Sequence, residues 1–423
     1  MVIPSTSMGE RKSVIVGYDA ISPLGSDLTT QWEKAVNGKS GIGPLTRFQP
    51  SDNFPIRIAG EVPDIDTSPY PFLSSRELAN WRSPIFKHGM LVVHRALEKS
   101  GIEINAELSP RVAVTFSSAV GGQDSVIHAD RRMIAEGKLP HPYTNPNSCI
   151  NMVGGKISIL TQATGPILST ITACSTGATS MIVGAMLLET GQADVAICGA
   201  VDFALVEPLV AGFATMNGAY KIKPNQPEES ASSASRPFSI NRRGFVVSEG
   251  AGAIILTTRE FADAHGLNYN IQLAGWGMTS DAHHFVAPYV PTVSRCIAQS
   301  IQNAGLCPED IDAINAHAAS TQIGDKVEFD ALKIIFGKNI PPITANKSLI
   351  GHAMGASSAI EIIFAMEGMS RDTLLPTINY HPDPEIPIAS LQTQEHTLKQ
   401  EFVLKNAFGF GGCNSCVVLQ KVN

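Results

Sequence analysis

Cys174 and His352 stand at the same place in two copies of one short sequence pattern. Each is followed, three residues later, by a run of small residues, Gly-Ala-Thr-Ser at 177–180 and Gly-Ala-Ser-Ser at 355–358, and then by an apolar segment. A repeated element of this kind indicates an internally duplicated chain. A pseudo-twofold axis between the copies would bring a thiol nucleophile and an imidazole together, and this arrangement predicts an enzyme.

The sequence around Cys174 predicts a position at the start of a helix. Residues 167–173 are typical of a strand, and residues 176–189 of a helix that ends just before Gly191. Because free N–H groups at a helix start favour an anion, we expect this position to lower the pKa of the thiol. For Cys174 alone, a small buried hydrophobic side chain is the alternative interpretation.

Two histidines and a lysine follow in the second half of the chain. His317 comes directly after a strand predicted at 311–315, and Lys347 and His352 share the loop sequence NKSLIGH at 346–352. Taken singly, each histidine is equally typical of a hydrogen-bonded core residue, and the lysine of a solvated surface charge. Because one histidine duplicates the position of Cys174, a shared site is the favoured interpretation.

Asp325 and Glu328 have capping-box spacing at the start of an apolar helix predicted at 327–336. A helix cap is favoured for Asp325, whereas Glu328 is either a cap or the counter-ion of a buried lysine. The sequence NAFGFGG at 406–412 follows a strand, and its glycines predict an irregular turn. The N–H groups of such a turn can face a developing oxyanion, although a hairpin corner is the alternative.

The elements that must position these residues alternate between strands and helices, which predicts an α/β fold. A chain of 423 residues is too long for one ordinary core, so we expect two domains, residues 1–260 and 261–423, with the boundary near 258–270. Ser83 and Pro84 are predicted to begin a helix. The other expected elements are strands at 14–21, 111–116, 195–200, 251–256, 402–407 and 416–419, a strand from 271, and helices at 84–100, 293–305 and after 352.

Composition excludes several classes of function. The net charge is −7 and no long basic run is present, which argues against nucleic acid as the main partner. The sequence has no uninterrupted stretch of about 18 apolar residues, so we do not expect a membrane span. The seven cysteines are scattered without metal-type clustering; Cys413 and Cys416 have CxxC spacing and are interpreted as structural, with a redox pair as the alternative. Residues 1–7 do not resemble a secretory signal, so we expect a cytoplasmic protein.

Four blocks together resemble the signature of β-ketoacyl-[acyl-carrier-protein] synthases: ACSTG at 173–177, NAHAAST at 315–321, NKSLIGH at 346–352 and NAFGFGG at 406–412. The resemblance extends from about residue 14 to 419 and is strongest to the Cys-His-His elongating type II enzymes of fatty acid synthesis. It implies the thiolase fold, with two pseudo-symmetric α/β/α halves, a five-stranded sheet in each, and five layers α-β-α-β-α. It also implies a homodimer and an acidic acyl carrier protein as partner.

The resemblance implies a decarboxylative condensation of an acyl thioester on Cys174 with malonyl-carrier. His317 and His352, as neutral donors, would bind the enolate oxygen. Lys347, paired with Glu328, would orient them. An oxyanion hole is implied at the N–H groups of Cys174 and Phe408, with Phe408 and Gly409 also forming a gate. No metal and no organic cofactor are expected, because loss of the malonyl carboxylate drives the reaction.

The resemblance also implies residues that bind the substrates. Val120 and Phe213 are expected as walls of the acyl pocket, with ordinary core packing as the alternative, and Thr321 and Phe410 as substrate contacts. Two hydroxyls that usually bind the pantetheine arm are missing, since Ala319 and Val286 stand at or near those places. Two lost hydrogen bonds of about 1 kcal/mol each would weaken binding of the arm, which suggests a dedicated carrier or a specialised pathway. A basic patch for the carrier could come from Arg76, Arg82, Lys87, Arg131, Arg132 and Lys138.

Two other functions remain open. The first is a non-catalytic partner subunit of the chain-length-factor kind, which normally lacks the cysteine. The second is a Cys-His hydrolase or simple acyltransferase, which needs one general-base histidine and no malonate. The presence of Cys174, His317, His352 and Lys347 together favours the condensing enzyme.

Overall fold

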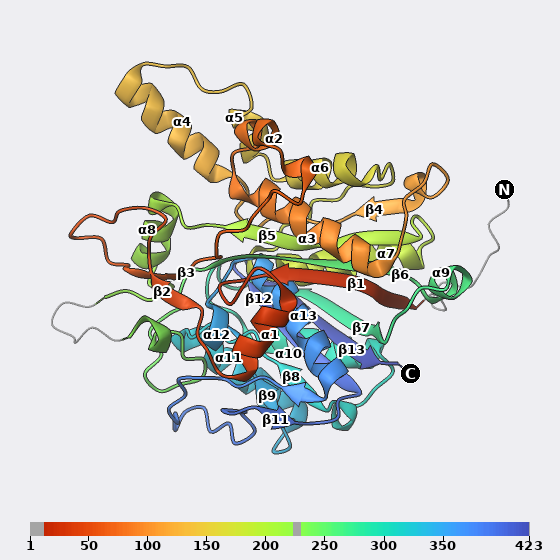
Figure 1. The fold of residues 1–423 in the computed structure, drawn as a ribbon. Helices are drawn as coiled ribbons and strands as arrows, with labels where there is room; N and C mark the ends of the chain where they lie inside the picture. The colour runs from red at the N-terminus through yellow and green to blue at the C-terminus, as the bar shows by residue number, and fades with distance from the viewer. Residues whose placement is uncertain (1–11, 223–229, 423) are drawn as a thin grey trace.

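The computed structural model describes residues 12–222 and 230–422. A nine-stranded sheet forms the centre of this structure (Figure 1). Its strand order is β4-β5-β6-β1-β7-β13-β12-β8-β9. Residues 1–7, where no secretory signal is expected, lie outside the described residues. The first half contributes β4 (Val112–Val114), β5 (Val195–Phe203), β6 (Glu249–Thr258) and β1 (Ser13–Ile21), and the second half β7 (Ile271–Ser280), β13 (Cys413–Lys421), β12 (Phe402–Gly409), β8 (Ala313–Asn315) and β9 (Ile343–Thr344).

The halves are joined where β1 and β7 pair antiparallel, from Ser13 to Ile15 on β1. Helices α7 (Thr176–Glu189) and α13 (Ala356–Arg371) lie at the centre, between the strands of the two halves (Figure 1). Helix α3 (Pro84–Ser100) covers the outer face of the first half, whereas α10 (Val290–Asn303) and α11 (Gln322–Phe336) cover the second. The five-layer thiolase fold is therefore confirmed.

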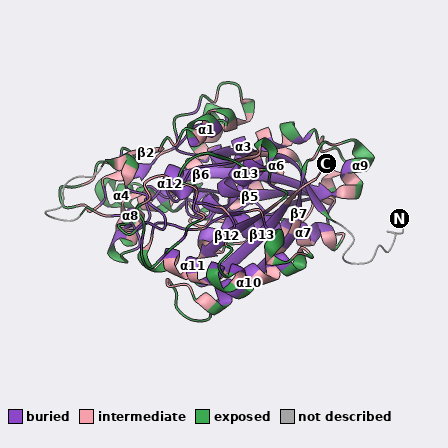
Figure 2. Ribbon diagram, turned by 90° about the horizontal axis from the view of Figure 1, so that it is seen from below, coloured by how far each residue is buried: buried purple, intermediate pink, exposed green. Residues whose placement is uncertain are grey.

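The sequences of the two central helices explain their position. Most residues of both helices are apolar or small, which is typical of a helix covered on both faces, and both are buried over most of their length (Figure 2). At Gly177 an added Cβ would lie 2.6 Å from the backbone nitrogen of Ala359, so only glycine allows this approach. The Gly177 N–H donates to the Gly355 carbonyl and the Ala178 N–H to Ser358 Oγ, both between the repeated runs of small residues.

The strand expected at 167–173 is the main error in the prediction of the fold. It is reduced to one isolated bridge between Ile167 and Val114, so the first half contributes four described strands to the nine-stranded sheet instead of the implied five. The apolar side chains of Ile167, Leu168 and Ile171 are exposed at this edge. The apolar pattern is therefore real, but the described chain offers no further strand with which the segment could pair.

One predicted helix start is confirmed and one differs from the structure. Helix α3 begins at Pro84 with Ser83 as its N-cap, as expected, although the Ser83 hydroxyl donates to Asp124 and makes no capping hydrogen bond. Helix α11 begins at Gln322 with Thr321 as its N-cap, five residues earlier than predicted. Asp325 is therefore not the N-cap; it lies in the first turn and accepts from the Thr321 N–H at 3.1 Å.

The remaining elements surround this core. No helix of the described residues is long and apolar enough to cross a membrane. Helix α4 (Gln123–Glu136) projects from the first half (Figure 1). The others are α1 (Leu28–Val36), α2 (Ser75–Asn80), α5 (Thr144–Ser148), α6 (Asn151–Thr161), α8 (Glu207–Thr215), α9 (Arg259–His265), α12 (Lys347–Ile350), β2 (Ile42–Pro44), β3 (Ile58–Gly60), β10 (Thr373–Leu374) and β11 (His396–Thr397).

Candidate active site

The duplicated pattern gives Cys174 and His352 similar backbone surroundings. Cys174 lies in a single 3₁₀ turn, Ala173–Ser175, immediately before α7, and His352 lies shortly before α13. The residue before each has a left-handed backbone, with φ of +49° at Ala173 and +71° at Gly351. Alanine adopts this conformation at a cost of roughly 1–2 kcal/mol, so the turn that presents Cys174 is strained.

One cavity of about 480 Å³ is lined by residues from both halves. The rings of His317 and His352 are nearly perpendicular, with centroids 5.8 Å apart, and the Phe408 ring lies 5.7 Å from that of His317. The structure thus brings together residues that are more than 200 positions apart in the chain. The predicted site residues that line the cavity are Cys174, His317, Thr321, His352, Phe408, Gly409 and Phe410.

Both imidazoles are uncharged at neutral pH. Burial lowers the pKa of His317 well below its usual value, and the nearby charges of Lys347 and Lys405 lower it further. Burial and the same two lysines lower the pKa of His352. Nδ1 of His352 is 2.9 Å from Ser357 Oγ, which leaves the other ring nitrogen for the cavity. Neutral histidines can donate a hydrogen bond to a developing negative charge without first losing a proton.

The predicted pairing of Lys347 with Glu328 is wrong. Lys347 Nζ donates to Glu361 Oε1 and to the carbonyl oxygen of His317, both at 2.6 Å. Glu328 instead accepts from the N–H groups of His317 and Ala318, at 2.9 and 2.7 Å, and from the Asn406 side chain. A buried carboxylate requires several donors, and the peptide groups after β8 provide two of them.

Sequence reasoning missed Glu361 and Lys405. Glu361 lies on α13, and each of its two oxygens accepts from one buried lysine, Lys347 or Lys405. A signal was present, because Glu361 interrupts the apolar segment at 359–366 and Lys405 interrupts the apolar strand at 402–408. A charged residue inside an otherwise apolar core element requires a buried partner of opposite charge.

The prediction that the helix start lowers the thiol pKa is also wrong. Burial raises the pKa of Cys174 to about 11, and the Asp202 carboxylate adds to this effect. The charge of Lys347 and the Phe410 N–H act in the opposite direction but are weaker. Cys174 precedes the first residue of α7 by two positions and is almost completely buried, so the cost of burying a thiolate dominates.

The structure also changes the expected oxyanion hole. The backbone N–H of Phe410 acts on the Cys174 thiol and lowers its pKa, so this N–H is available to the oxyanion hole in addition to that of Phe408. Strand β12 continues through Gly409, so the segment expected to be irregular from 406 begins to turn only at 410. A Cβ at Gly409 would lie 2.2 Å from the Thr172 carbonyl oxygen. This glycine therefore lets β12 approach the nucleophile closely enough for Phe410 to reach it.

Two sequence models of one family match most of the chain. The β-ketoacyl synthase N-terminal domain matches residues 10–262, and the C-terminal domain matches residues 271–381. The chain is 33% identical over 422 residues to 3-oxoacyl-[acyl-carrier-protein] synthase 2 of Coxiella burnetii, covering 98% of this chain and 100% of that protein. It is 30% identical over 417 residues to the protein of the same name from Staphylococcus aureus strain COL, covering 97% of this chain and 98% of that protein.

The chain belongs to the β-ketoacyl synthase family. Solved structures agree: a β-ketoacyl synthase from Burkholderia phymatum superposes with a TM-score of 0.89 at 25% identity, covering 98% of this chain and 100% of that one. The ishigamide ketosynthase/chain length factor superposes with a TM-score of 0.88 at 26% identity and the same coverage. Family membership makes this protein an acyltransferase-class enzyme.

In this β-ketoacyl synthase the expected acyl-pocket residues lie beside the cavity and do not line it. Val120 and Phe213 are half-buried in a hydrophobic cluster that contains Phe245, and the rings of Phe213 and Phe245 are 5.6 Å apart. Phe245 contacts His352 in turn, at 5.2 Å between centroids. This cluster is next to the reacting groups, and its members Phe245 and Phe410 also line the cavity.

Among the described residues, three of the six side chains expected in the basic patch form ion pairs with glutamates. Arg131 pairs with Glu207, and Arg132 and Lys138 both pair with Glu136. Arg82 and Lys87 line a cavity of about 390 Å³ beside Trp81, away from the catalytic cavity. The patch is therefore smaller and less basic than the sequence predicts.

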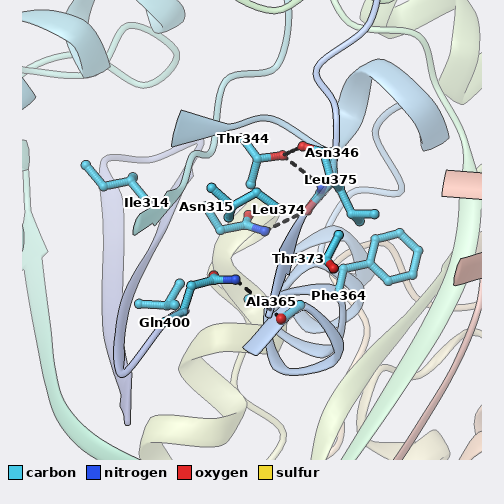
Figure 3. A pocket seen from close by; sticks show the side chains of 12 residues that line it. Ile314, Asn315, Thr344, Asn346, Phe364, Ala365, Thr373, Leu374, Leu375 and Gln400 are labelled. Carbon is cyan, nitrogen blue, oxygen red and sulfur yellow. Dashed lines mark hydrogen bonds between the residues drawn. The ribbon is translucent and has the colours of Figure 1, made fainter. Parts of the chain in front are cut away.

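A small hollow behind β8 supports the site but does not bind a ligand (Figure 3). Its volume of about 10 Å³ is room for one water at most. Asn315 Nδ2 donates to Asn346 Oδ1 at 2.6 Å, which fixes the residue before Lys347 against the end of β8. Among the described residues, no group of three metal-ligating side chains lies together.

We expect alkylation of Cys174 by iodoacetamide to accelerate about tenfold per pH unit from pH 7 to 10, because a thiol of pKa about 11 is mostly protonated over this range. In Lys347→Met the rate at pH 8 is expected to fall, because the charge that lowers the thiol pKa is gone. Peptide mapping by mass spectrometry separates Cys174 from the exposed Cys149 and Cys307. A rate plateau near pH 7 in the unmodified enzyme would contradict the role of burial.

Proposed function

We propose that this enzyme condenses an acyl group held on Cys174 with malonyl-[acyl-carrier protein], in fatty acid or related lipid or polyketide synthesis. The observation that carries the proposal is one cavity lined by a buried thiol, two neutral imidazoles and Phe410, whose backbone N–H lowers the pKa of that thiol. The relatives named 3-oxoacyl-[acyl-carrier-protein] synthase 2 support this reaction.

In the first step the Cys174 sulfur attacks the acyl thioester. The new sulfur–carbon bond forms first and gives a tetrahedral intermediate; the bond to the carrier then breaks, and the thiol proton passes to the departing carrier thiolate. A neutral imidazole in the cavity can relay this proton, which matters because the Cys174 thiol is mostly protonated at neutral pH. The N–H groups of Cys174 and Phe410 bind the oxyanion of the tetrahedral intermediate.

In the second step malonyl-carrier loses carbon dioxide, and the electrons of the broken carbon–carbon bond form an enolate on the thioester. His317 and His352 donate hydrogen bonds to the enolate oxygen. The enolate carbon attacks the acyl carbonyl, the Cys174 thioester breaks, and the sulfur takes up a proton from water. The products are a 3-oxoacyl-carrier two carbons longer, free carrier and carbon dioxide. No step uses a metal or an organic cofactor.

The direct test mixes the enzyme with acyl-carrier and malonyl-carrier labelled in its free carboxylate. We expect labelled carbon dioxide and a product two carbons longer. Removing the hydrogen-bond donors in His317→Ala or His352→Ala should cost at least tenfold in decarboxylation, because each contributes transition-state stabilisation. Thioester hydrolysis without chain extension would favour a Cys-His hydrolase. No turnover from a folded enzyme would favour a non-catalytic partner subunit.

The carrier's pantetheine arm is expected to enter through the cavity mouth. Thr321, Ala319 and Val286 all line this cavity, so the two positions that lack the usual hydroxyls face the path of the arm. We propose that weaker arm binding suits a dedicated carrier, and that Arg82 and Lys87 contribute to docking of its acidic surface. Comparing turnover between the host's general carrier and any second carrier tests this, and a clear preference for the general one would contradict it.

Restoring one hydroxyl with Ala319→Thr should lower the KM for malonyl-carrier about fivefold, because one hydrogen bond contributes about 1 kcal/mol. Initial rates against carrier concentration measure the change. The same factor is expected with a malonyl-pantetheine substrate that has no protein carrier. As a control, Arg82→Glu should raise the KM for the carrier substrate alone. An unchanged KM in Ala319→Thr with both substrates would mean that the arm does not contact position 319.

We further propose a homodimer formed through the edge of the sheet at residues 167–171. An exposed edge with three large apolar side chains is a site for pairing with another strand, and a second copy provides one by twofold symmetry. Replacing Leu168 and Ile171 with aspartate should halve the molar mass measured by light scattering. Ile334→Asp, at an exposed apolar residue of α11, is the matched control. A wild-type mass equal to one chain would contradict the dimer.

A cytoplasmic location is the last part of the proposal. All seven cysteines have free thiols, including the exposed Cys149 and Cys307, which is typical of a reducing compartment. Fractionation of cells that express the full chain tests this, and recovery from a secreted or envelope fraction would contradict it.

A further inference from the structure

Lys405 has no part in the reaction as described, yet its side chain is completely buried directly behind the two histidines. It lies on β12, and its Nζ donates to Glu361 Oε2 at 2.7 Å and to the carbonyl oxygen of Ala316 at 3.1 Å. Burying an ammonium group is costly unless it is paired and hydrogen-bonded. Both of its partners are themselves connected to the site.

The second buried lysine has matching partners. Lys347 donates to the other oxygen of Glu361 and to the carbonyl oxygen of His317, the residue after Ala316. The two ammonium groups therefore hold two successive carbonyls at the end of β8 and share one carboxylate. Glu328 accepts from the N–H groups of these same two peptide groups, at His317 and Ala318. The peptide groups that carry His317 are thus fixed by charged side chains on both sides.

The four charged residues Lys347, Lys405, Glu361 and Glu328 are referred to here as the buried quartet. They come from α12, β12, α13 and α11, and all four side chains are at most 1% exposed. When both carboxylates are ionised the two positive and two negative charges cancel. Without Lys405 the remaining three would carry a net negative charge next to two imidazoles, and a negative charge favours the protonated imidazolium.

We infer that Lys405 is a positioning residue whose ammonium group completes the buried quartet, fixes the peptide that carries His317 and keeps both imidazoles uncharged. The role rests on the proposed function, because only a reaction that needs neutral histidine donors benefits from it. Burial raises the pKa of Glu328, and the charge of Lys405 opposes this rise. Burial and Lys347 lower the pKa of His317 and His352, and the charge of Lys405 lowers it further. Each imidazole faces the other imidazole, Lys347 and Lys405, and the Cys174 thiol lines the same cavity.

The pKa of Lys405 itself is lowered to about 8 by burial and by the charge of Lys347, against the opposing effect of Glu361. Lys405 therefore begins to lose its proton within one pH unit of neutrality. Once it is neutral, the buried quartet carries a net negative charge. We expect the benefit of Lys405 to be complete below pH 7 and to diminish as the pH rises through 8.

The test uses charge balance, which a purely structural role would not follow. Lys405→Gln keeps a hydrogen-bond donor but removes the charge, and it should raise the pH at which His317 and His352 titrate by about one unit. Glu361→Gln removes a negative charge and should lower that pH. The double variant restores the balance and should return the midpoints close to those of the wild type. NMR of the full enzyme with labelled histidine measures the titrations, and His317→Ala and His352→Ala assign the signals.

Lys421→Gln is the matched control. Lys421 also donates to one carboxylate and one carbonyl, those of Asp372 and Met369, but far from the site, so its loss should leave both titrations unchanged. In the decarboxylation assay at pH 7, Lys405→Gln should lose about tenfold in kcat with KM within twofold. The NMR readout needs no substrate, so it separates failure of this inference from failure of the proposed reaction.

Three results would overturn the inference: unmoved histidine titrations in a folded Lys405→Gln enzyme, shifts of the same sign in both single variants, or a double variant no closer to wild type than either single one. If Lys405→Gln does not fold but the double variant does, charge balance is still supported. If neither folds, Lys405 is a structural residue and the inference fails.

Discussion

The approach of α7 to α13 at the centre of the molecule is the constraint on which the rest of the structure depends. At Gly177 the helices are so close that one added methyl group would meet the backbone of Ala359. Because each helix begins shortly after a reactive residue, this contact places the starts of both helices, and with them Cys174 and His352, at one cavity. The five layers, the join between β1 and β7 and the small residues of the repeated pattern all serve to bring these two ends together.

Burial then decides the chemistry of the groups at this meeting point. It keeps both imidazoles neutral, and it holds the thiol protonated against the nearby lysine charge. The same burial would make isolated charges intolerable, so the charged residues behind the histidines occur as mutually paired lysines and glutamates. Electrostatic control of the site therefore comes from side chains that never touch the substrate.

Much of this could be predicted from the sequence, because some signals are local. Hydrophobic periodicity and helix-end residues predict the bounds of α3 and α7 and the alternation of strands and helices. The short repeat predicts that Cys174 and His352 share a site. The errors concern properties that depend on three-dimensional neighbours. The family resemblance implies Glu328 as the partner of Lys347, but the lysine reaches Glu361, which lies on another helix. The thiol pKa follows burial instead of the helix start. Strand β12 extends further than its glycines suggest, which brings the Phe410 N–H to the thiol.

The central claim is that Cys174 carries the growing chain and gives it up to a carbon nucleophile. Intact-mass analysis in a single turnover tests it most directly. After incubation with acyl-carrier, the account predicts one acyl adduct on the enzyme, absent in Cys174→Ala, that disappears when malonyl-carrier is added and reappears in a 3-oxoacyl-carrier two carbons longer. An adduct on another residue, or loss of the adduct only as free fatty acid, would contradict it.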